Sequence, residues 1–222
     1  MSDRLLLWDF DGTLADTLSL SLETYNQLAT DHGFKTIEDG EAVRDMPLKQ
    51  FLKSHGIPAW KMPLLFAKGL KRTSGAIGTA PLFLGIPEAL AALRLSGFRH
   101  AIVSSNSTAS IQLCLEFNDV VDLFDEVCGT SKLAGKERRI RKAMMQRGLE
   151  PDDCLYLGDE VRDIEAARAA HLEVGCVSWG LNSVSALDRH SPAFVAQSAD
   201  QLPDLIQQHF AARGCEQKPA AR

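Results

Sequence analysis

The segment from Leu5 to Thr13 constrains the fold of this chain more than any other. Leu5-Leu6-Leu7-Trp8 is a continuous apolar run without polar alternation, and it passes directly into Asp9-Phe10-Asp11-Gly12-Thr13. A short uninterrupted apolar run is typical of a strand that is buried on both faces, as in a parallel sheet. The run therefore predicts a buried parallel strand with two aspartates at its carboxyl end and a tight turn after them.

After a connector rich in Gly, Ala and Pro at 74–85, short apolar runs alternate with amphipathic stretches. Such alternation predicts an α/β fold, a doubly wound, Rossmann-like and mostly parallel sheet with right-handed crossovers. The predicted strands are 100–104, 125–128, 154–157, 173–178 and 194–196, and the predicted helices are 87–96, 110–117, 136–148, 163–170 and 202–210.

The stretch between the first strand and this alternating part has a different character. From Asp16 to Ser74 the apolar residues recur at mostly helical spacing, with Gly33 as a helix stop and two further helices at 41–55 and 60–72. We therefore expect an all-helical domain inserted after the first strand. The predicted domain limits are 1–15 and 82–212 for the α/β core, 16–81 for the helical insertion, and 213–222 for a flexible tail.

Charge and cysteine usage narrow the class of protein. The net charge is −5, from 24 Lys and Arg against 29 Asp and Glu, which argues against a nucleic-acid partner. The five cysteines form no Cys-x-x-Cys pair and no Cys/His metal spacing, as expected in a reducing compartment. No apolar stretch approaches the ~20 residues of a membrane span. We expect a soluble, cytoplasmic protein without a membrane partner, as a monomer or homodimer.

Residues suited to chemistry follow several predicted strands. Because ligands of doubly wound sheets bind beyond the carboxyl ends of the strands, Asp9, Asp11, Asp159 and Asp163 are expected in one cleft. Four carboxylates there would repel one another and raise their own pKa values, and a hard divalent cation such as Mg²⁺ would relieve this. The residues expected to join them at this edge are Ser104, Ser105, Asn106 and Lys136.

These segments, in this order, resemble the haloacid dehalogenase superfamily, and within it the phosphoglycolate-phosphatase-like hydrolases. The similarity is carried by Leu7-Trp8-Asp9-Phe10-Asp11-Gly12-Thr13-Leu14, by Ile102-Val103-Ser104-Ser105-Asn106, by the lysine of Ala134-Gly135-Lys136, and by Tyr156-Leu157-Gly158-Asp159-Glu160-Val161-Arg162-Asp163-Ile164. Each motif alone is weak evidence, whereas the ordered set of four is specific. The likeness extends from about Leu5 to Leu205.

The resemblance implies a role for each matching position. Asp9 would attack phosphorus and form an aspartyl phosphate, and Asp11 would protonate the leaving oxygen and then activate water. Ser105 and Lys136 would bind the phosphoryl group. Mg²⁺ would be held by Asp9, by the main-chain carbonyl of Asp11 and by Asp159, with Asp163 as a direct or water-mediated ligand. The presence of Asp11 favours phosphoester chemistry over carbon–halogen cleavage.

The resemblance also implies that the helical insertion is a cap that closes over the substrate and excludes water. Substrate-reading residues are expected near 44–49, where Arg44 and Lys49 are candidates for a second anionic group of the substrate. Thr13 and Asn106 complete the set of predicted substrate-binding residues. The substrate is expected to be a small phosphorylated metabolite, which resembles phosphoglycolate or a sugar phosphate.

Some alternatives remain open at this point. Lys132 competes with Lys136 as the phosphate-binding lysine, and Glu160 competes with Asp163 as a metal ligand. A phosphomutase similar to β-phosphoglucomutase would use the same residues but return the phosphoryl group to a sugar. A non-catalytic binding or regulatory protein on the same scaffold is the alternative from a different class.

Overall fold

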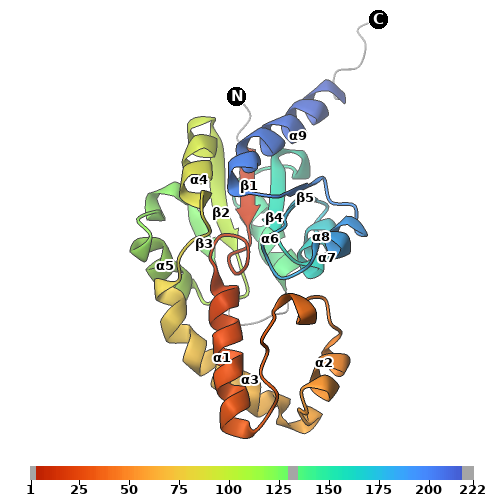
Figure 1. Ribbon diagram of the computed structural model, residues 1–222. Coiled ribbons are helices and arrows are strands. Elements are labelled where there is room, and N and C mark those ends of the chain that lie inside the picture. The colour runs from red at the N-terminus through yellow and green to blue at the C-terminus, as the bar shows by residue number, and fades with distance from the viewer. Residues whose placement is uncertain (1–3, 130–134, 217–222) are drawn as a thin grey trace, which may run out of the picture.

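A computed structural model describes residues 4–129 and 135–216 of the chain (Figure 1). Its centre is a six-stranded parallel sheet in the order β3-β2-β1-β4-β5-β6, which confirms the predicted doubly wound α/β core. The strands are β1 (Arg4–Trp8), β2 (Phe98–Val103), β3 (Glu126–Cys128), β4 (Cys154–Gly158), β5 (Glu173–Val177) and β6 (Phe194–Ala196).

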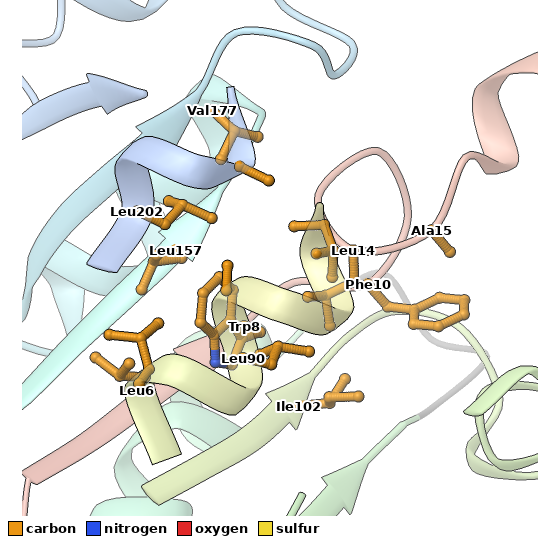
Figure 2. Packing of buried hydrophobic residues seen from close by; sticks show 14 of the residues in the cluster. Leu6, Trp8, Phe10, Leu14, Ala15, Leu90, Ile102, Leu157, Val177 and Leu202 are labelled. Atoms are coloured by element: carbon orange, nitrogen blue, oxygen red, sulfur yellow. The ribbon is translucent and has the colours of Figure 1, made fainter. Parts of the chain in front are cut away.

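Helices cover both faces of this sheet. They are α4 (Ile86–Leu95), α5 (Thr108–Phe117), α6 (Lys136–Met145), α7 (Val161–Ala169), α8 (Val184–Asp188) and α9 (Leu202–Glu216). Side chains alternate across β1, so that Leu6 and Trp8 pack with Leu90 and Leu202 on one face, as Figure 2 shows. Leu5 and Leu7 pack on the opposite face against residues of α6 and α7. Burial on both faces explains why the Leu5–Trp8 run has no polar alternation.

The residues between β1 and α4 are helical wherever they form regular structure. They contain α1 (Thr17–His32), α2 (Leu48–Ser54) and α3 (Met62–Ala76), with 3₁₀ turns at Glu41–Val43, Ala59–Lys61 and Ile77–Thr79. In Figure 1 these helices extend beyond one end of the sheet, and α9 lies at the opposite end. No strand occurs among the described residues of this insertion, as the periodicity predicts.

Several predicted boundaries differ from the structure. The helix predicted over 41–55 is broken, because Asp45 has a left-handed φ of 61° and Pro47 precedes the first residue of α2. Helix α8 has only five residues and was not predicted. Helix α9 runs to Glu216, past the predicted start of a flexible tail at 213, and residues 217–222 lie outside the described part.

No helix among the described residues is both long enough and apolar enough to cross a bilayer. The cysteines that the structure describes, Cys114, Cys128, Cys154 and Cys176, are free thiols, as the sequence leads us to expect.

Candidate active site

A group of acidic side chains gathers where β1 and β4 end. These two strands are neighbours in the sheet, with Trp8 opposite Leu157, so Asp9 and Asp159 leave the sheet side by side. The chain runs from β1 to β2 and β3 on one side and from β4 to β5 and β6 on the other. The acids therefore lie at the point where the strand order reverses, which is the usual ligand site of doubly wound sheets.

Asp9 is almost fully buried, with 2% of its surface exposed. Its main-chain N–H continues the sheet by donating to the carbonyl of Leu157 at 2.8 Å. Its carboxylate accepts one hydrogen bond from the N–H of Phe10 and a charge-assisted one from Lys136, whose Nζ is 2.7 Å from Oδ2. These contacts hold the carboxylate in one orientation at the end of β1.

Asp159 and Asp163 are fully buried at the end of β4 and in the first turn of α7. The hydroxyl of Thr13 donates to Asp159 Oδ1 at 2.8 Å, and the N–H of Glu160 donates to Asp163 Oδ2 at 3.2 Å. Burial and the charges of Asp163 and Asp9 raise the pKa of Asp159 well above its usual range. Burial and Asp9 likewise raise the pKa of Asp163, although Lys136 opposes this.

Lys136 is the cation that faces these acids. It begins α6, and its Nζ contacts both Asp9 Oδ2 and Asp163 Oδ1. The ring of Tyr156 lies beneath it, with its centroid 5.5 Å from Nζ. Burial alone would lower the pKa of Lys136, but the negative charges of Asp9 and Asp163 outweigh it and raise this pKa well above its usual value. The ammonium group therefore stays charged inside the site.

Asp11 lies beside the cluster in the turn after β1 and is less buried than Asp9. The amide of Asn106 donates to its Oδ1 at 3.2 Å, and the hydroxyl of Ser104 is 3.5 Å from its Oδ2. Burial and the charge of Asp9 raise the pKa of Asp11, whereas hydrogen bonds from Thr17 and Asn106 oppose the rise. A carboxyl group of this kind is suited to giving and taking a proton.

Two glycines allow the main chain to approach Asp159. Gly12 has a left-handed φ of 74°, and a Cβ there would lie 2.4 Å from Asp159 Oδ2. A Cβ on Gly180 would lie 2.1 Å from the Cβ of Asp159. Gly180 belongs to the loop 178–183 after β5, which also donates the N–H of Leu181 to Asp159 Oδ2 at 2.7 Å. Turn and loop together enclose this carboxylate.

The buried carboxylates can hold a metal ion. One oxygen from each of Asp9, Asp159 and Asp163 lies within 4.8 Å of the other two. Lys136 supplies one positive charge against these three acids, and the raised pKa values of Asp159 and Asp163 reflect the burial and repulsion that it does not offset. An all-oxygen set of buried carboxylates of this kind suits a hard divalent cation.

The remaining predicted residues differ in how close they lie to the acid cluster. Ser105 lines a cavity of about 340 Å³ together with Lys136 and Arg162, whereas Ser104 is the serine whose hydroxyl faces Asp11. Lys49 is exposed on α2. Lys132 lies outside the described residues, so its competition with Lys136 stays open.

Arg44 does not have a free guanidinium in this structure. Its Nη1 pairs with Glu41 at 2.9 Å, its Nε donates to the carbonyl of Leu181 at 3.1 Å, and its Nη2 lies among further carbonyl groups of the loop 178–183. Its predicted contact with an anionic substrate stays a prediction, and that contact requires Arg44 to give up some of these bonds.

For Trp179-Gly180 the sequence favours core packing or a loop hinge over a place in the site, whereas the structure brings the loop 178–183 against Asp159. The loop contacts Asp159 through the main-chain N–H of Leu181, and a main-chain contact cannot be recognised from the type of the residue that makes it. The assignment of the phosphoryl contact to Ser105 stays a prediction. Of the two serines, Ser104, which directly follows β2 as Asp9 directly follows β1, is the one whose hydroxyl faces Asp11.

Comparisons with known proteins agree with this geometry. Residues 6–177 match the family model of the haloacid dehalogenase-like hydrolases. A phosphoglycolate phosphatase from Synechococcus elongatus is 28% identical over 207 residues, which cover 92% of this chain and 98% of that protein.

Solved structures share the fold. A predicted phosphatase from Clostridium acetobutylicum superimposes with a TM-score of 0.77 at 22% identity, covering 93% of this chain and 99% of that one. A candidate β-phosphoglucomutase from Thermotoga maritima gives a TM-score of 0.69 at 17% identity, covering 92% and 99%. At such identities the structural likeness concerns the fold alone.

Proposed function

The chain belongs to the haloacid dehalogenase-like hydrolases, and we propose that it is a Mg²⁺-dependent phosphatase that hydrolyses a small phosphorylated metabolite through an aspartyl phosphate on Asp9. The observation that carries the proposal is the buried cluster of Asp9, Asp159 and Asp163, contacted by the ammonium group of Lys136. An anionic nucleophile, a cation that neutralises the transferred group and a ligand set for a divalent ion are the parts that phosphoryl transfer needs.

In the first step, a carboxylate oxygen of Asp9 attacks phosphorus while the bond to the leaving oxygen breaks. Asp11 donates its proton to that oxygen, so the product leaves as a neutral alcohol. The raised pKa of Asp11 supports this role, because the carboxyl group then holds a proton more readily. Lys136 neutralises charge that develops on the phosphoryl oxygens.

In the second step, Asp11 has become a carboxylate and takes a proton from water. The water oxygen attacks phosphorus, the bond to Asp9 breaks, and inorganic phosphate is released. Splitting the reaction in this way replaces one difficult displacement by two easier ones. Ser104, Ser105 and Asn106 are the proposed contacts for the phosphoryl group or for Asp11 at this edge of the sheet.

Asp9, Asp159 and Asp163, together with the carbonyl of Asp11, are the residues that would hold Mg²⁺. When bound, this ion would lower the repulsion between the Asp9 carboxylate and the anionic substrate, which is several kcal/mol at ~4 Å in a medium of intermediate dielectric. Thr13 and Lys136 would keep the carboxylates oriented through their bonds to Asp159, Asp9 and Asp163.

The helices between 16 and 81 form the proposed cap domain, and 1–15 with 82–212 form the proposed core domain. A cap over the nucleophile would exclude water until substrate is bound. A small phosphorylated metabolite fits this arrangement, and phosphoglycolate is the first candidate because the Synechococcus elongatus relative is named for it. Lys49 is the proposed contact for a second anionic group. The protein is proposed to act in the cytoplasm.

The test is a panel of phosphorylated metabolites with purified protein and Mg²⁺, in which free phosphate is measured. We expect release from at least one small phosphoester, with Asp9→Asn and a chelator each abolishing it. Release by Asp9→Asn at the wild-type rate, or no release from any substrate, contradicts the proposal. Analysis of the sugar product separates the phosphatase from the alternative phosphomutase, which would yield an isomeric sugar phosphate instead of free phosphate.

A further inference from the structure

Arg44 connects the helical insertion to the core. It lies between the 3₁₀ turn Glu41–Val43 and α2, and its side chain is 18% exposed. Its guanidinium reaches four main-chain carbonyl oxygens of the loop 178–183, at distances of 2.5 to 3.2 Å. These carbonyls belong to Ser178, Gly180, Leu181 and Asn182. A planar group with five N–H donors can serve several carbonyls at once, which an ammonium group on a single flexible stem cannot reproduce.

Asp45 holds the same loop through acceptors instead of donors. Its Oδ1 accepts from the amide Nδ2 of Asn182 at 3.0 Å and from the main-chain N–H of Ser183 at 3.1 Å. Its left-handed φ of 61° is a conformation that Asp and Asn tolerate better than most residues. Burial opposes ionisation of Asp45, but these hydrogen bonds lower its pKa below the usual value. Two adjacent residues thus bind both the carbonyls and an N–H of one loop.

The other side of that loop faces Asp159. The N–H of Leu181 donates to Asp159 Oδ2 at 2.7 Å, and the N–H of Asn182 donates to the Asp159 carbonyl at 3.2 Å. The side-chain oxygen of Asn182 also accepts from the N–H of Val161 at the start of α7, at 2.9 Å. The loop therefore fixes the position of an acid that belongs to the buried carboxylate cluster.

We propose that Arg44 and Asp45 form a latch that couples docking of the helical insertion to the position of the Asp159 carboxylate. When the insertion is docked, the loop 178–183 is held from outside and in turn holds Asp159. When the insertion moves away, the carbonyls and the N–H groups of the loop lose these partners and the hold on Asp159 weakens. Arg44 is then a positioning residue, in place of the direct substrate contact that the sequence predicts.

The inference rests on the proposed function in one respect: docking of the helical insertion would accompany substrate binding. The coupling itself concerns the free protein. Allosteric couplings are commonly worth a factor of about 5 to 150 in affinity. We therefore expect a latch of this kind to change divalent-ion affinity by about fivefold or more.

The experiment compares Arg44→Met, Arg44→Lys, Asp45→Gly and Asp45→Asn in substrate-free protein. Gly at position 45 removes the acceptor without backbone strain, and Asn keeps both an acceptor and tolerance of the left-handed conformation. Lys53→Met, an exposed charge on α2, is the matched control. Hydrogen exchange of the amides at 181–183 reports the loop, and electron paramagnetic resonance of added Mn²⁺ reports metal affinity.

Arg44→Met, Arg44→Lys and Asp45→Gly are expected to speed exchange of these amides and to weaken Mn²⁺ binding, each by about fivefold or more. Asp45→Asn and Lys53→Met are expected to match wild type. Unchanged exchange and Mn²⁺ affinity in Asp45→Gly overturn the latch, even if Arg44→Met fails to fold. Full recovery in Arg44→Lys also overturns it, because charge alone would then suffice. Neither readout needs turnover, so absence of phosphate release would overturn the proposed function without deciding this inference.

Discussion

Lys136 Nζ lies 2.7 Å from Asp9 Oδ2, although the two residues are 127 positions apart in the sequence. The contact joins the start of α6 to the end of β1, and both side chains are buried. A buried charge pair of this kind is sensitive to the loss of either member, because the remaining charge then lacks a partner.

Replacement of Lys136 by Met is expected to lower kcat by about 10² to 10³, the usual loss when a donor to developing charge is removed. Without metal it is also expected to destabilise the fold by about 3–5 kcal/mol, because Asp9 and Asp163 lose their shared cation. Added Mg²⁺ should restore part of this stability. Thermal unfolding with and without Mg²⁺ measures both the loss and the recovery, and Lys142→Met, at an exposed position of α6, is the control. Equal unfolding temperatures in the two variants contradict the assignment.

The two serines after β2 can be separated by alanine substitutions. Ser104 is fully buried, its Oγ faces Asp11 and accepts from the N–H of Asn106 at 3.1 Å, whereas Ser105 lies toward Lys136 and Arg162. We expect Ser104→Ala to lower kcat by roughly tenfold, equivalent to one hydrogen bond, and Ser105→Ala to act mainly on KM. Steady-state kinetics on the best substrate decides this. A larger loss of kcat in Ser105→Ala would support the original sequence prediction.

Glu160 is expected to be dispensable for metal binding. Its carboxylate pairs with Arg162 at 2.5 Å and is not among the oxygens of the three-acid cluster. Glu160→Gln should therefore keep Mg²⁺ affinity and most activity, whereas Asp159→Asn should lose both. Titration calorimetry of each variant with Mg²⁺ is the measurement. Loss of binding in Glu160→Gln would place this acid among the ligands.

A methyl group added at Gly180 is expected to displace Asp159, whose side chain supplies the nearest atoms to the new Cβ. The added Cβ would lie 2.1 Å from the Asp159 Cβ, so the loop must move away. Overpacking of this kind commonly costs about 1–3 kcal/mol, and weaker Mg²⁺ binding should accompany it. Gly75→Ala is the control, because its added Cβ meets nothing within 4 Å and Ala favours the helix α3. Chemical unfolding and Mg²⁺ titration of both variants test the expectation, and wild-type values for Gly180→Ala would contradict it.

The lowered pKa of His100 is expected to make the free energy of unfolding depend on pH. It is fully buried, its Nδ1 accepts from the indole N–H of Trp8 at 3.0 Å, and burial, aided by Arg94, lowers its pKa from 6.5 to about 4. Between these values the unfolded chain binds a proton that the folded chain does not, so stability falls as the pH falls from 6.5 to 4. The loss attributable to His100 is at most about 3 kcal/mol. Denaturant unfolding of wild type and His100→Gln across this range isolates it, and parallel curves would contradict the expectation.

Residue type and position allow much of the fold and of the acid cluster to be predicted. Leu5–Trp8 marks a strand because it is apolar on both faces, and Asp9 and Asp159 mark the site because each directly follows such a strand. Helix α8 escapes prediction because five residues are too few to show a period. The contacts of Arg44 escape it as well, since their partners are main-chain carbonyls more than 130 positions away.

The order of strands also has a consequence for synthesis of the protein. β1 is made before the other strands of the sheet, yet it lies between β2 and β4, and β4 begins only at Cys154. At 5–20 residues per second the ribosome needs roughly 7 to 30 s to pass from the end of β1 to β4. During this time one side of an apolar strand has no partner, which makes it open to pairing with other chains. The nascent chain is therefore expected to need protection, by chaperones or by the ribosome surface, until β4 emerges.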